Sequence, residues 1–302
     1  MNAIVLLNPS AGSLFVRKAA HDVERVGLTF AAAGLAAEVE LIRGEDLEPV
    51  ARRAARRHVD MVVVGGGDGS VGAAAAALAD TGTPLGILPF GTLNHFARDV
   101  GVPFHLDEAV AVLAAGHVLS VDVAEVNGLV FVNNSMVGAY PLLVEERETH
   151  RRHRHTGKLR AGAHAFASVT RRLPSVTMQI STGDTSTRFD TSLLVIGNNR
   201  YATGVLGFGR RAALDGGLLS VYATHGRRRR HAALSLARLV TGRPEAANLL
   251  QAAAVPAITV TVADPSVKVS ADGEVRHLRS PLHYRIRPRA LRVVAPPPPP
   301  GT

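Results

Sequence analysis

The stretch VVVGGGDGSVGAAAAAL, residues 62–78, limits most strongly what this chain can fold into. Consecutive valines suit a strand buried on both faces, and the run of alanines after them is a strong helix former. Between them, glycines and one aspartate form a short turn. The stretch therefore predicts one strand–loop–helix unit of a parallel α/β sheet.

The same alternation continues through about the first 120 residues. Apolar strands are expected at residues 3–8, 37–42, 60–65 and 84–89. Helical spacing of apolar residues is found at 16–30, around Val50 and Ala54, at 73–79, at 92–100 and at 107–115. We therefore expect a nucleotide-binding α/β domain with a parallel sheet at residues 1–120.

The pattern changes near residue 120. Asn127-Gly128 lies between two apolar runs and is a strong signal for a two-residue hairpin. Further short strands are expected at residues 175–180, 191–198, 218–224, 257–262 and 283–287. These features predict a C-terminal antiparallel β-rich sandwich domain at 121–294 with inserted basic helices, followed by a proline-rich tail at 295–302.

Composition excludes several classes of protein. The chain has no cysteine, so disulfides, thiol catalysis and cysteine-ligated zinc are all excluded. No apolar run approaches the ~18 residues of a membrane span, and the N-terminus does not resemble a signal peptide. We expect a cytoplasmic protein that can associate with a membrane peripherally.

Positive charge is concentrated in two segments. Residues 147–172 hold eight Lys/Arg and one acid, and residues 226–243 hold six Arg and no acid, within a chain of net charge +9. The remainder of the chain is therefore net negative. The segments either meet an anionic surface or are solvated helical faces, and both interpretations stay open. Aromatic residues make up only 4% of the chain, which disfavours nucleic acid as the partner.

Three short loops carry the candidate chemistry. They follow the first, third and fourth expected strands and read NPSAG (8–12), GGGDGS (65–70) and PFGTLNHFAR (89–98). Glycines allow backbone amides to approach phosphate oxygens closely, and ligands of open parallel sheets bind at the carboxyl ends of the strands. Any one loop could be an ordinary chain reversal, but three at one sheet edge favour a phosphate-binding site.

The glycines Gly67, Gly69 and Gly72 also spell the dinucleotide fingerprint GxGxxG. That fingerprint belongs in the first strand–helix unit and requires an acid at the end of the next strand, whereas here it follows the third strand and no acid follows. Asp68 would repel a bare phosphate unless a divalent cation or an incoming hydroxyl lay beside it. The loop therefore favours phosphoryl transfer over dinucleotide binding.

Taken together, these motifs resemble those of the diacylglycerol kinase/sphingosine kinase catalytic family, including its bacterial soluble lipid kinases. The resemblance rests on residues 8–12, 66–70 and 88–98, together with LDGGLLSVY at 214–222 and SADGE at 270–274. It covers nearly the whole chain except the proline tail. The GGDG element alone is shared with NAD kinases and phosphofructokinases, so the combination carries the resemblance.

The resemblance implies an ATP- and Mg²⁺-dependent kinase acting on diacylglycerol or a similar lipid, with ATP in a cleft between the domains. It implies that Asp68 belongs to a catalytic, magnesium-linked acidic network, that Glu274 is the general base, and that Asp215 holds a structural metal. The residues implied to bind the nucleotide are Asn8, Pro9, Ser10, Ala11, Gly12, Gly66, Gly67, Gly69, Ser70, Gly91, Thr92 and Asn94.

Four positions depart from the family pattern. His95 stands where an aspartate is common, Gly216 and Ser220 replace acids near Asp215, and Arg43 replaces a small polar residue. These departures put metal binding at His95 and Asp215 in question. An NAD kinase and an inactive nucleotide- or membrane-binding module therefore remain the alternatives. The expected partners are a lipid substrate and an anionic membrane surface, not nucleic acid, and a homodimer is compatible with the sequence.

Overall fold

The computed structural model describes residues 1–10, 19–145, 176–183, 185–201, 211, 213–224 and 249–297. The chain divides into two compact units, Met1–Val123 with Arg287–Thr302, and Ala124–Ile286. The two basic segments expected to be helical (147–172 and 226–243) lie entirely outside the described residues, as do Ala11 and Gly12. Sequence alone placed the second domain at 121–294, whereas the end of the chain from Arg287 groups with the first unit.

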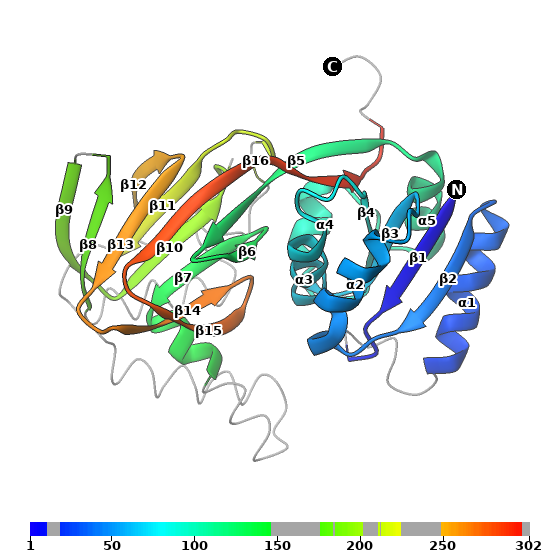
Figure 1. The fold of residues 1–302 in the computed structure, drawn as a ribbon, viewed down its shortest axis with the longest axis horizontal. Helices are drawn as coiled ribbons and strands as arrows, with labels where there is room; N and C mark the ends of the chain where they lie inside the picture. Colours follow the sequence, from blue (N-terminus) through cyan, green and yellow to red (C-terminus); the bar gives the residue numbers. More distant parts are fainter. Residues whose placement is uncertain are drawn as a thin grey trace. The chain divides into compact units, whose positions relative to one another are not determined.

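Four parallel strands form the centre of the first unit (Figure 1). They are β1 (Asn2–Leu7), β2 (Ala36–Leu41), β3 (Met61–Gly66) and β4 (Leu85–Pro89), in the order β2-β1-β3-β4. The far end of β16 (Leu282–Val294) lies beside β4, with Val293 opposite Leu85. Every residue of β3 is buried, as expected for a valine-rich strand covered on both faces. The predicted parallel α/β fold is confirmed.

Helices connect these strands. They are α1 (Ala19–Ala32), η1 (Gly44–Asp46), α2 (Leu47–Ala55), α3 (Asp68–Leu78), α4 (His95–Val100) and α5 (Leu106–Ala115). The chain moves to one side from β1 to β2 and to the other side from β3 to β4. Right-handed crossovers therefore place α1 and α3 on opposite faces of the sheet, and α1 contacts α5 whereas α2 contacts α3. The direction of chain progress therefore reverses between β1 and β3, and sheets of this kind bind ligands at the carboxyl ends of the strands beside such a reversal.

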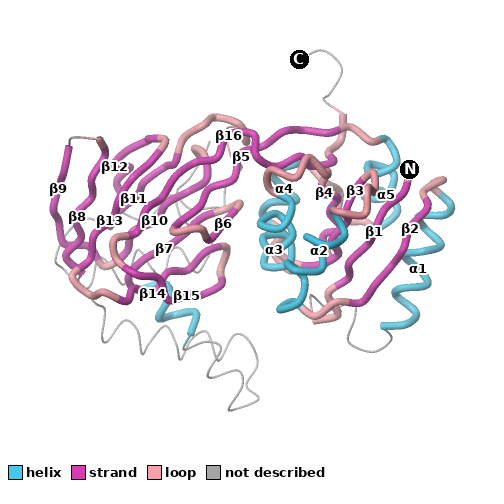
Figure 2. Tube along the Cα trace, viewed as in Figure 1, coloured by secondary structure: helices cyan, strands magenta, loops and turns pink. Residues whose placement is uncertain are grey.

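In the part of the second unit that the structure describes, antiparallel strands form most of the chain, together with a helical segment at residues 139–145 (Figure 2). One sheet has the order β12-β11-β10-β7-β14-β15, and the other strands run β16-β13-β8-β9, with β6 beside β5. Their bounds are β5 (Val118–Val126), β6 (Leu129–Phe131), β7 (Asn134–Gly138), β8 (Val176–Thr182), β9 (Thr185–Thr191), β10 (Leu193–Asn198), β11 (Leu219–Thr224), β12 (Leu249–Val255), β13 (Ala257–Val262), β14 (Ser266–Ala271) and β15 (Glu274–Arg279).

A single hydrophobic cluster fills the space between the two layers of this unit. It takes Ile196 and Val269 from one sheet, and Met178, Val260 and Tyr284 from the other. Each of these side chains is fully or almost fully buried. This shared core confirms the predicted β-rich sandwich.

Two differences from the sequence-based expectations have local causes. The helix expected from residue 92 begins at His95, because Asn94 takes a left-handed conformation with φ 50°. Five strands (β7, β9, β12, β14 and β15) were not predicted as separate strands. Of these, β9 and β15 carry mostly exposed polar or charged side chains and therefore lack the apolar alternation of a half-buried strand.

Among the described residues, no helix has both the length and the apolar character needed to cross a membrane.

Candidate active site

Two of the predicted loops touch each other at the sheet edge. The Gly91 amide donates to the Gly66 carbonyl at 3.1 Å, and a β-carbon on Gly91 would lie 2.4 Å from the Gly67 Cα. No side chain fits at residue 91 without moving the facing backbone. The two loops after β3 and β4 are therefore held as one surface of backbone groups.

Asn8 joins the third loop to this surface. Its Nδ2 donates to Ser70 Oγ at 2.9 Å, and its Oδ1 accepts the amide of Ser10 at 3.0 Å. The backbone amide of Asn8 donates to the Gly65 carbonyl at 2.9 Å. Ser70 is buried in the first turn of α3, so these bonds fix the start of the NPSAG loop against that turn.

Asn94 organises the loop that follows β4. Its side-chain amide donates to the carbonyls of Pro89 (3.1 Å) and Gly91 (2.9 Å), and its Oδ1 accepts the Gly91 amide at 3.0 Å. Asn94 itself is buried, whereas Thr92 is exposed at the tip of the loop. His95 begins α4 and is partly buried. Asn94 thus shapes the loop from inside, whereas Thr92 and Leu93 are exposed to solvent.

Asp68 is the carboxylate of this site. It begins α3, and its Oδ1 accepts the Phe96 amide of α4 at 3.5 Å. Two helix starts therefore converge on one partly buried carboxylate. Among the described residues, no three His, Asp or Glu side chains gather to hold a metal ion. One carboxylate still fits Mg²⁺, because this ion is commonly held by one or two carboxylates together with substrate phosphates.

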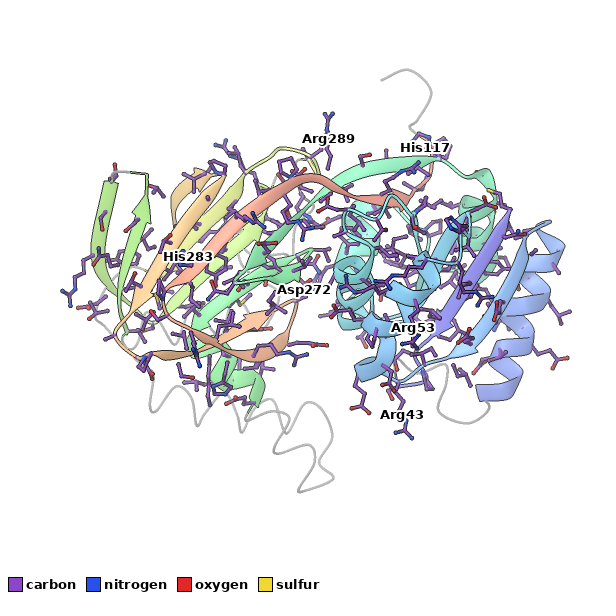
Figure 3. The ribbon with its side chains drawn as sticks, viewed as in Figure 1. Arg43, Arg53, His117, Asp272, His283 and Arg289 are labelled. Atoms are coloured by element: carbon purple, nitrogen blue, oxygen red, sulfur yellow. The ribbon has the colours of Figure 1, made fainter. Side chains whose placement is uncertain are left out.

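A pocket of 430 Å³ lies at the end of β2, lined by Leu41, Ile42, Arg43, Asp46, Pro49, Val50 and Arg53. It adjoins the Asn8 loop, since a β-carbon on Gly44 would lie 3.2 Å from Asn8 Nδ2. Arg43 follows β2 and Arg53 comes from α2 (Figure 3). The volume falls within the ~300–1,000 Å³ of small-molecule sites.

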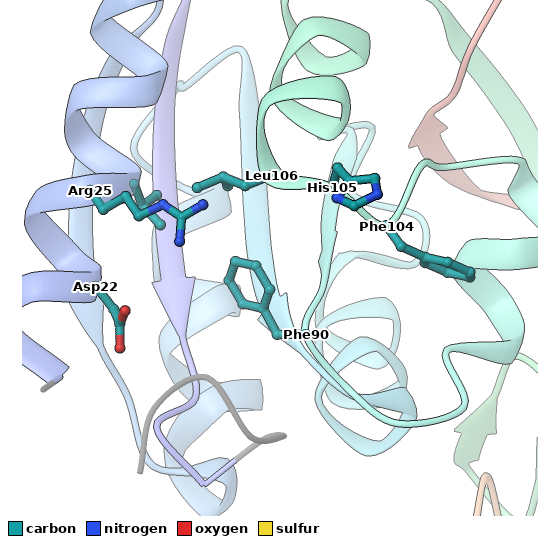
Figure 4. Close-up of a pocket in the computed structure, with 7 residues that line it drawn as sticks. Asp22, Arg25, Phe90, Phe104, His105 and Leu106 are labelled. Carbon is teal, nitrogen blue, oxygen red and sulfur yellow. The ribbon is translucent and has the colours of Figure 1, made fainter. Parts of the chain in front are cut away.

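A second, smaller pocket lies between α1, the residue after β4 and the start of α5 (Figure 4). Asp22 and Arg25 line it from α1, with Phe90 and Phe104, and its volume is 160 Å³. Within the described part of the chain, the buried Oδ2 of Asp22 has no hydrogen-bond partner. This pocket is smaller than typical sites for nucleotide-sized ligands.

Glu274 lies in the second unit, at the start of β15. Its side chain is half exposed, and its Oε2 lies 2.9 Å from Nη2 of Arg276. The two residues before it, Asp272 and Gly273, both have positive φ (46° and 86°), which is a hairpin turn of type I′. The DGE sequence therefore forms a hairpin turn, and the carboxylate of Glu274 at its end remains accessible to solvent.

The remaining predicted metal residue, Asp215, is exposed in the segment before β11. Next to it, a β-carbon on Gly216 would lie 2.9 Å from Asn199 Oδ1, so a larger residue could not enter without a shift. The buried guanidinium of Arg211 donates to the carbonyls of Val132 (2.5 Å) and Asn198 (3.4 Å). No group of three His, Asp or Glu side chains surrounds Asp215 among the described residues, so a metal at this position stays a prediction.

Sequence reasoning gave no role to Asp272, Asp46 or Arg53. The first accepts three backbone amides, and the other two line the larger pocket. The Asp-Gly dipeptide does signal a turn, but its partners are more than 130 residues away along the chain. Asp46, at the end of η1, precedes Pro49 and Val50 by one helical turn, and Arg53 follows them by one turn on α2. This i, i+3/i+4 spacing was a signal in the sequence that these four residues share one helix face.

Comparison with known proteins identifies the class. A model of the diacylglycerol kinase catalytic domain matches residues 2–126, and a model of the YegS C-terminal NAD kinase beta sandwich-like domain matches residues 143–295, about half of the chain. The chain therefore belongs to the lipid kinase family that combines these two domains, and the resemblance found in the sequence is confirmed.

Similar proteins are found in two Yersinia species. Proteins named "Probable lipid kinase YegS-like" from Yersinia pestis (strain Pestoides F) and Yersinia pseudotuberculosis serotype O:1b (strain IP 31758) are each 33% identical over 141 residues, 45% of this chain and 46% of the relative. The matched region thus spans about half the length of these relatives.

Two solved structures from Bacillus anthracis str. Sterne share the fold, one titled "Crystal structure of a putative diacylglycerol kinase" and the other "The crystal structure of a diacylglycerol kinases". One has a TM-score of 0.75 at 23% identity, and another has 0.68 at 19% identity. Both comparisons cover 98% of this chain and 97% of the other.

Proposed function

We propose that this protein is a lipid kinase that transfers the γ-phosphate of ATP to a hydroxyl of diacylglycerol or a similar lipid. The observation that most supports this proposal is the single surface made by the loops after β1, β3 and β4, which includes Asp68. The first unit then holds the nucleotide, and the second unit presents the lipid hydroxyl to a base.

The loop surface suits a triphosphate. Glycine-containing loops and helix starts are the elements whose backbone amides bind phosphate oxygens in other proteins, because they bring partial positive charge without a bulky side chain. Asn8, Gly67 and Gly91 shape this surface, with Thr92 exposed beside it. Asp68 would hold Mg²⁺ together with the phosphates, and the ion would neutralise negative charge during transfer.

The pocket beside Asn8 offers space for the base and ribose. Leu41, Ile42 and Val50 give it apolar contact, and Arg43 and Arg53 supply planar cations that can stack on a base. This arrangement accounts for Arg43, which the sequence alone left as a departure. The ATP phosphates and the adenosine would then occupy adjoining parts of one unit.

Glu274 is the proton acceptor in this proposal. The lipid oxygen forms a bond to the γ-phosphorus while the bond from that phosphorus to the β–γ bridging oxygen breaks, which leaves ADP. The hydroxyl proton passes to the carboxylate of Glu274, as in general-base catalysis. A half-exposed carboxylate at a rigid turn suits this task.

The lipid substrate implies work at a membrane surface. We extend the proposal to a cytoplasmic protein that binds anionic membranes peripherally through the basic segments 147–172 and 226–243. Each basic residue near such a surface contributes on the order of 1 kcal/mol. NAD kinase activity and an inactive binding module are the competing functions, because both would use the same loops.

One transfer assay separates these functions. Purified protein receives labelled ATP and MgCl₂ with diacylglycerol, monoacylglycerol or sphingosine in anionic vesicles, and with NAD in a parallel tube. We expect label in a lipid and none in NAD. Label in NAD alone would contradict the lipid proposal, and ATP binding without any transfer would support the inactive module.

A further inference from the structure

The carboxylate of Asp272 makes a concentrated set of contacts in the second unit. Its Oδ2 accepts the Val132 amide at 2.7 Å, and its Oδ1 accepts the amides of Asn133 (2.8 Å) and Asn134 (3.2 Å). In return, the Asp272 amide donates to the Asn134 carbonyl at 2.9 Å. These bonds join two parts of the chain that are 138 to 140 residues apart.

The Asp272 side chain extends the hydrogen bonding between β14 and β7 past the end of their backbone pairing. β14 pairs with β7 up to Ala271 opposite Ser135, where the regular pairing ends. Asp272 then turns into the left-handed region, which aspartate tolerates better than most residues. Beyond this point β14 offers no further backbone partners to β7. The carboxylate of Asp272 accepts the amides of residues 132–134 instead.

Residues 132–134 are themselves firmly held. The Asn198 amide donates to the Asn133 carbonyl at 3.0 Å, and Asn198 Nδ2 donates to the Val132 carbonyl at 3.0 Å. Asn133 and Asn198 are buried. Asp272 therefore binds to a rigid support that is tied to β10 as well as to β7.

β15 needs such a support at its start. It is the last strand of its sheet, pairs only with β14 among the described strands, and exposes most of its side chains. Glu274 is its first residue, opposite Ala271 and directly after the two-residue turn. Without the bonds at Asp272, the turn would be fixed by a single ladder at the edge of the sheet.

We propose that Asp272 is the positioning residue for Glu274, because it locks the turn onto the amides of Val132, Asn133 and Asn134. This inference rests on the proposed function, since it takes Glu274 as the proton acceptor. Asp272 does not act on the substrate, because its oxygens already receive three amide donors. A displacement of about 1 Å in a catalytic group can slow a reaction by up to about 100-fold, so the lock has a measurable effect.

The test uses Asp272→Asn, with Asp264→Asn as its matched control. Asp264 lies two residues before the other end of β14, and its Oδ1 accepts the Ser266 amide at 2.9 Å. With diacylglycerol in phosphatidylglycerol-containing vesicles, Asp272→Asn should lower kcat about 10- to 100-fold. The KM of Asp272→Asn for ATP should stay as in the wild type, and so should the kcat of the control Asp264→Asn.

A double variant separates positioning from a general loss of structure. In the Glu274→Gln background, Asp272→Asn should cause no further loss of kcat, because the group that it positions is already gone. An unchanged kcat in Asp272→Asn, or an equal further loss in the double variant, would overturn the proposal. Should Asp272→Asn fail to fold, Asp272→Glu replaces it, since that variant keeps the charge but shifts the oxygens, and a wild-type kcat there would also overturn the proposal.

Amide hydrogen exchange gives a readout that does not depend on activity. Peptides covering residues 131–135 and 271–275 should exchange faster in Asp272→Asn than in the wild type, and Asp264→Asn should match the wild type there. Unchanged exchange in both peptides would overturn the lock itself. If the wild type transfers phosphate to no lipid while exchange does increase, the lock stands and the proposed lipid kinase function fails.

Discussion

The side-chain amide of Asn8 donates a 2.9 Å hydrogen bond to the hydroxyl of Ser70, across 62 residues of sequence. The bond connects the loop after β1 to the first turn of α3, at the place between β1 and β3 where the strand order reverses. Together with the contact between Gly67 and Gly91, it makes three separate loops into one surface.

Gly91→Ala should weaken ATP binding by at least about tenfold, or about 1.4 kcal/mol. The added β-carbon would meet the backbone of Gly67 at 2.4 Å and Asn94 Oδ1 at 2.5 Å, so the two loops must separate. Isothermal titration with ATP and MgCl₂ measures the effect.

Gly27→Ala is the matched control for this change. It lies within α1, has open space around its Cα, and should gain up to about 1 kcal/mol of stability from the helix propensity of alanine. Wild-type affinity in Gly91→Ala would show that the contact of the two loops does not shape the nucleotide site.

Asp68→Asn should lower kcat by about 100-fold or more and remove most of the dependence of the rate on MgCl₂. Asparagine keeps an oxygen for the Phe96 amide, so the free energy of unfolding should change by less than about 1 kcal/mol. Steady-state kinetics over a MgCl₂ series measures both effects. Asp107→Asn, an exposed change in the first turn of α5, should leave the rate unchanged. A wild-type magnesium response in Asp68→Asn would remove Asp68 from the metal site.

Tyr284→Phe should lower the free energy of unfolding by about 1–2 kcal/mol. The Tyr284 hydroxyl is buried 3.1 Å from Ser135 Oγ, and its loss leaves a buried hydroxyl on Ser135. Adding Ser135→Ala should recover much of the loss, because both polar groups are then absent. Urea unfolding followed by circular dichroism measures the three variants, and additive losses would contradict the pairing.

The same tyrosine predicts a dependence on alkaline pH. Burial raises the pKa of Tyr284 well above its ordinary value, and the bond to Ser135 opposes this only in part. Below about pH 10 both the folded and the unfolded chain keep this proton, so its contribution to stability is complete. Above that pH the unfolded chain loses the proton first, and stability falls as pH rises. The fall between pH 9.5 and 11 should be shallower in Tyr284→Phe; an equal slope would contradict the raised pKa.

Replacing Arg227, Arg228, Arg229 and Arg230 with glutamine should weaken binding to anionic vesicles, by on the order of 1 kcal/mol per charge. Vesicle sedimentation at low and high salt measures this, because screening should weaken wild-type binding as well. The exposed arginines Arg52 and Arg56 on and after α2 give a control variant, Arg52→Gln/Arg56→Gln. Binding that ignores salt and lipid charge would refute docking through this basic segment.

Much of the fold was readable in the sequence because its signals are local. The valine run before Gly65 and the alanine run after Ser70 are each sufficient to predict β3 and α3. β15 was not predicted, because an edge strand can carry charges such as Arg276 and Arg279 on both faces. Its existence depends on pairing with β14, which no local pattern records.

The candidate site divides in the same way. Loop glycines and Asp68 could be named from residue type and order, and the structure brings the loops together as the strand order requires. The partners of Asp272 could not be named, because they depend on the register between β14 and β7. The pocket beside Asn8 likewise depends on how η1 and α2 follow β2, and sequence gave Arg43 only as a departure from a pattern.

The most direct test of the central claim is a measurement of both products in one reaction. Wild-type protein is incubated with ATP, MgCl₂ and diacylglycerol in anionic vesicles, and ADP and phosphorylated lipid are quantified over time beside Glu274→Gln. We expect the wild type to form ADP and phosphorylated lipid in equal amounts, and Glu274→Gln to form both at least about 100 times more slowly. ADP without lipid phosphate in the wild type, or full activity in Glu274→Gln, would contradict the account.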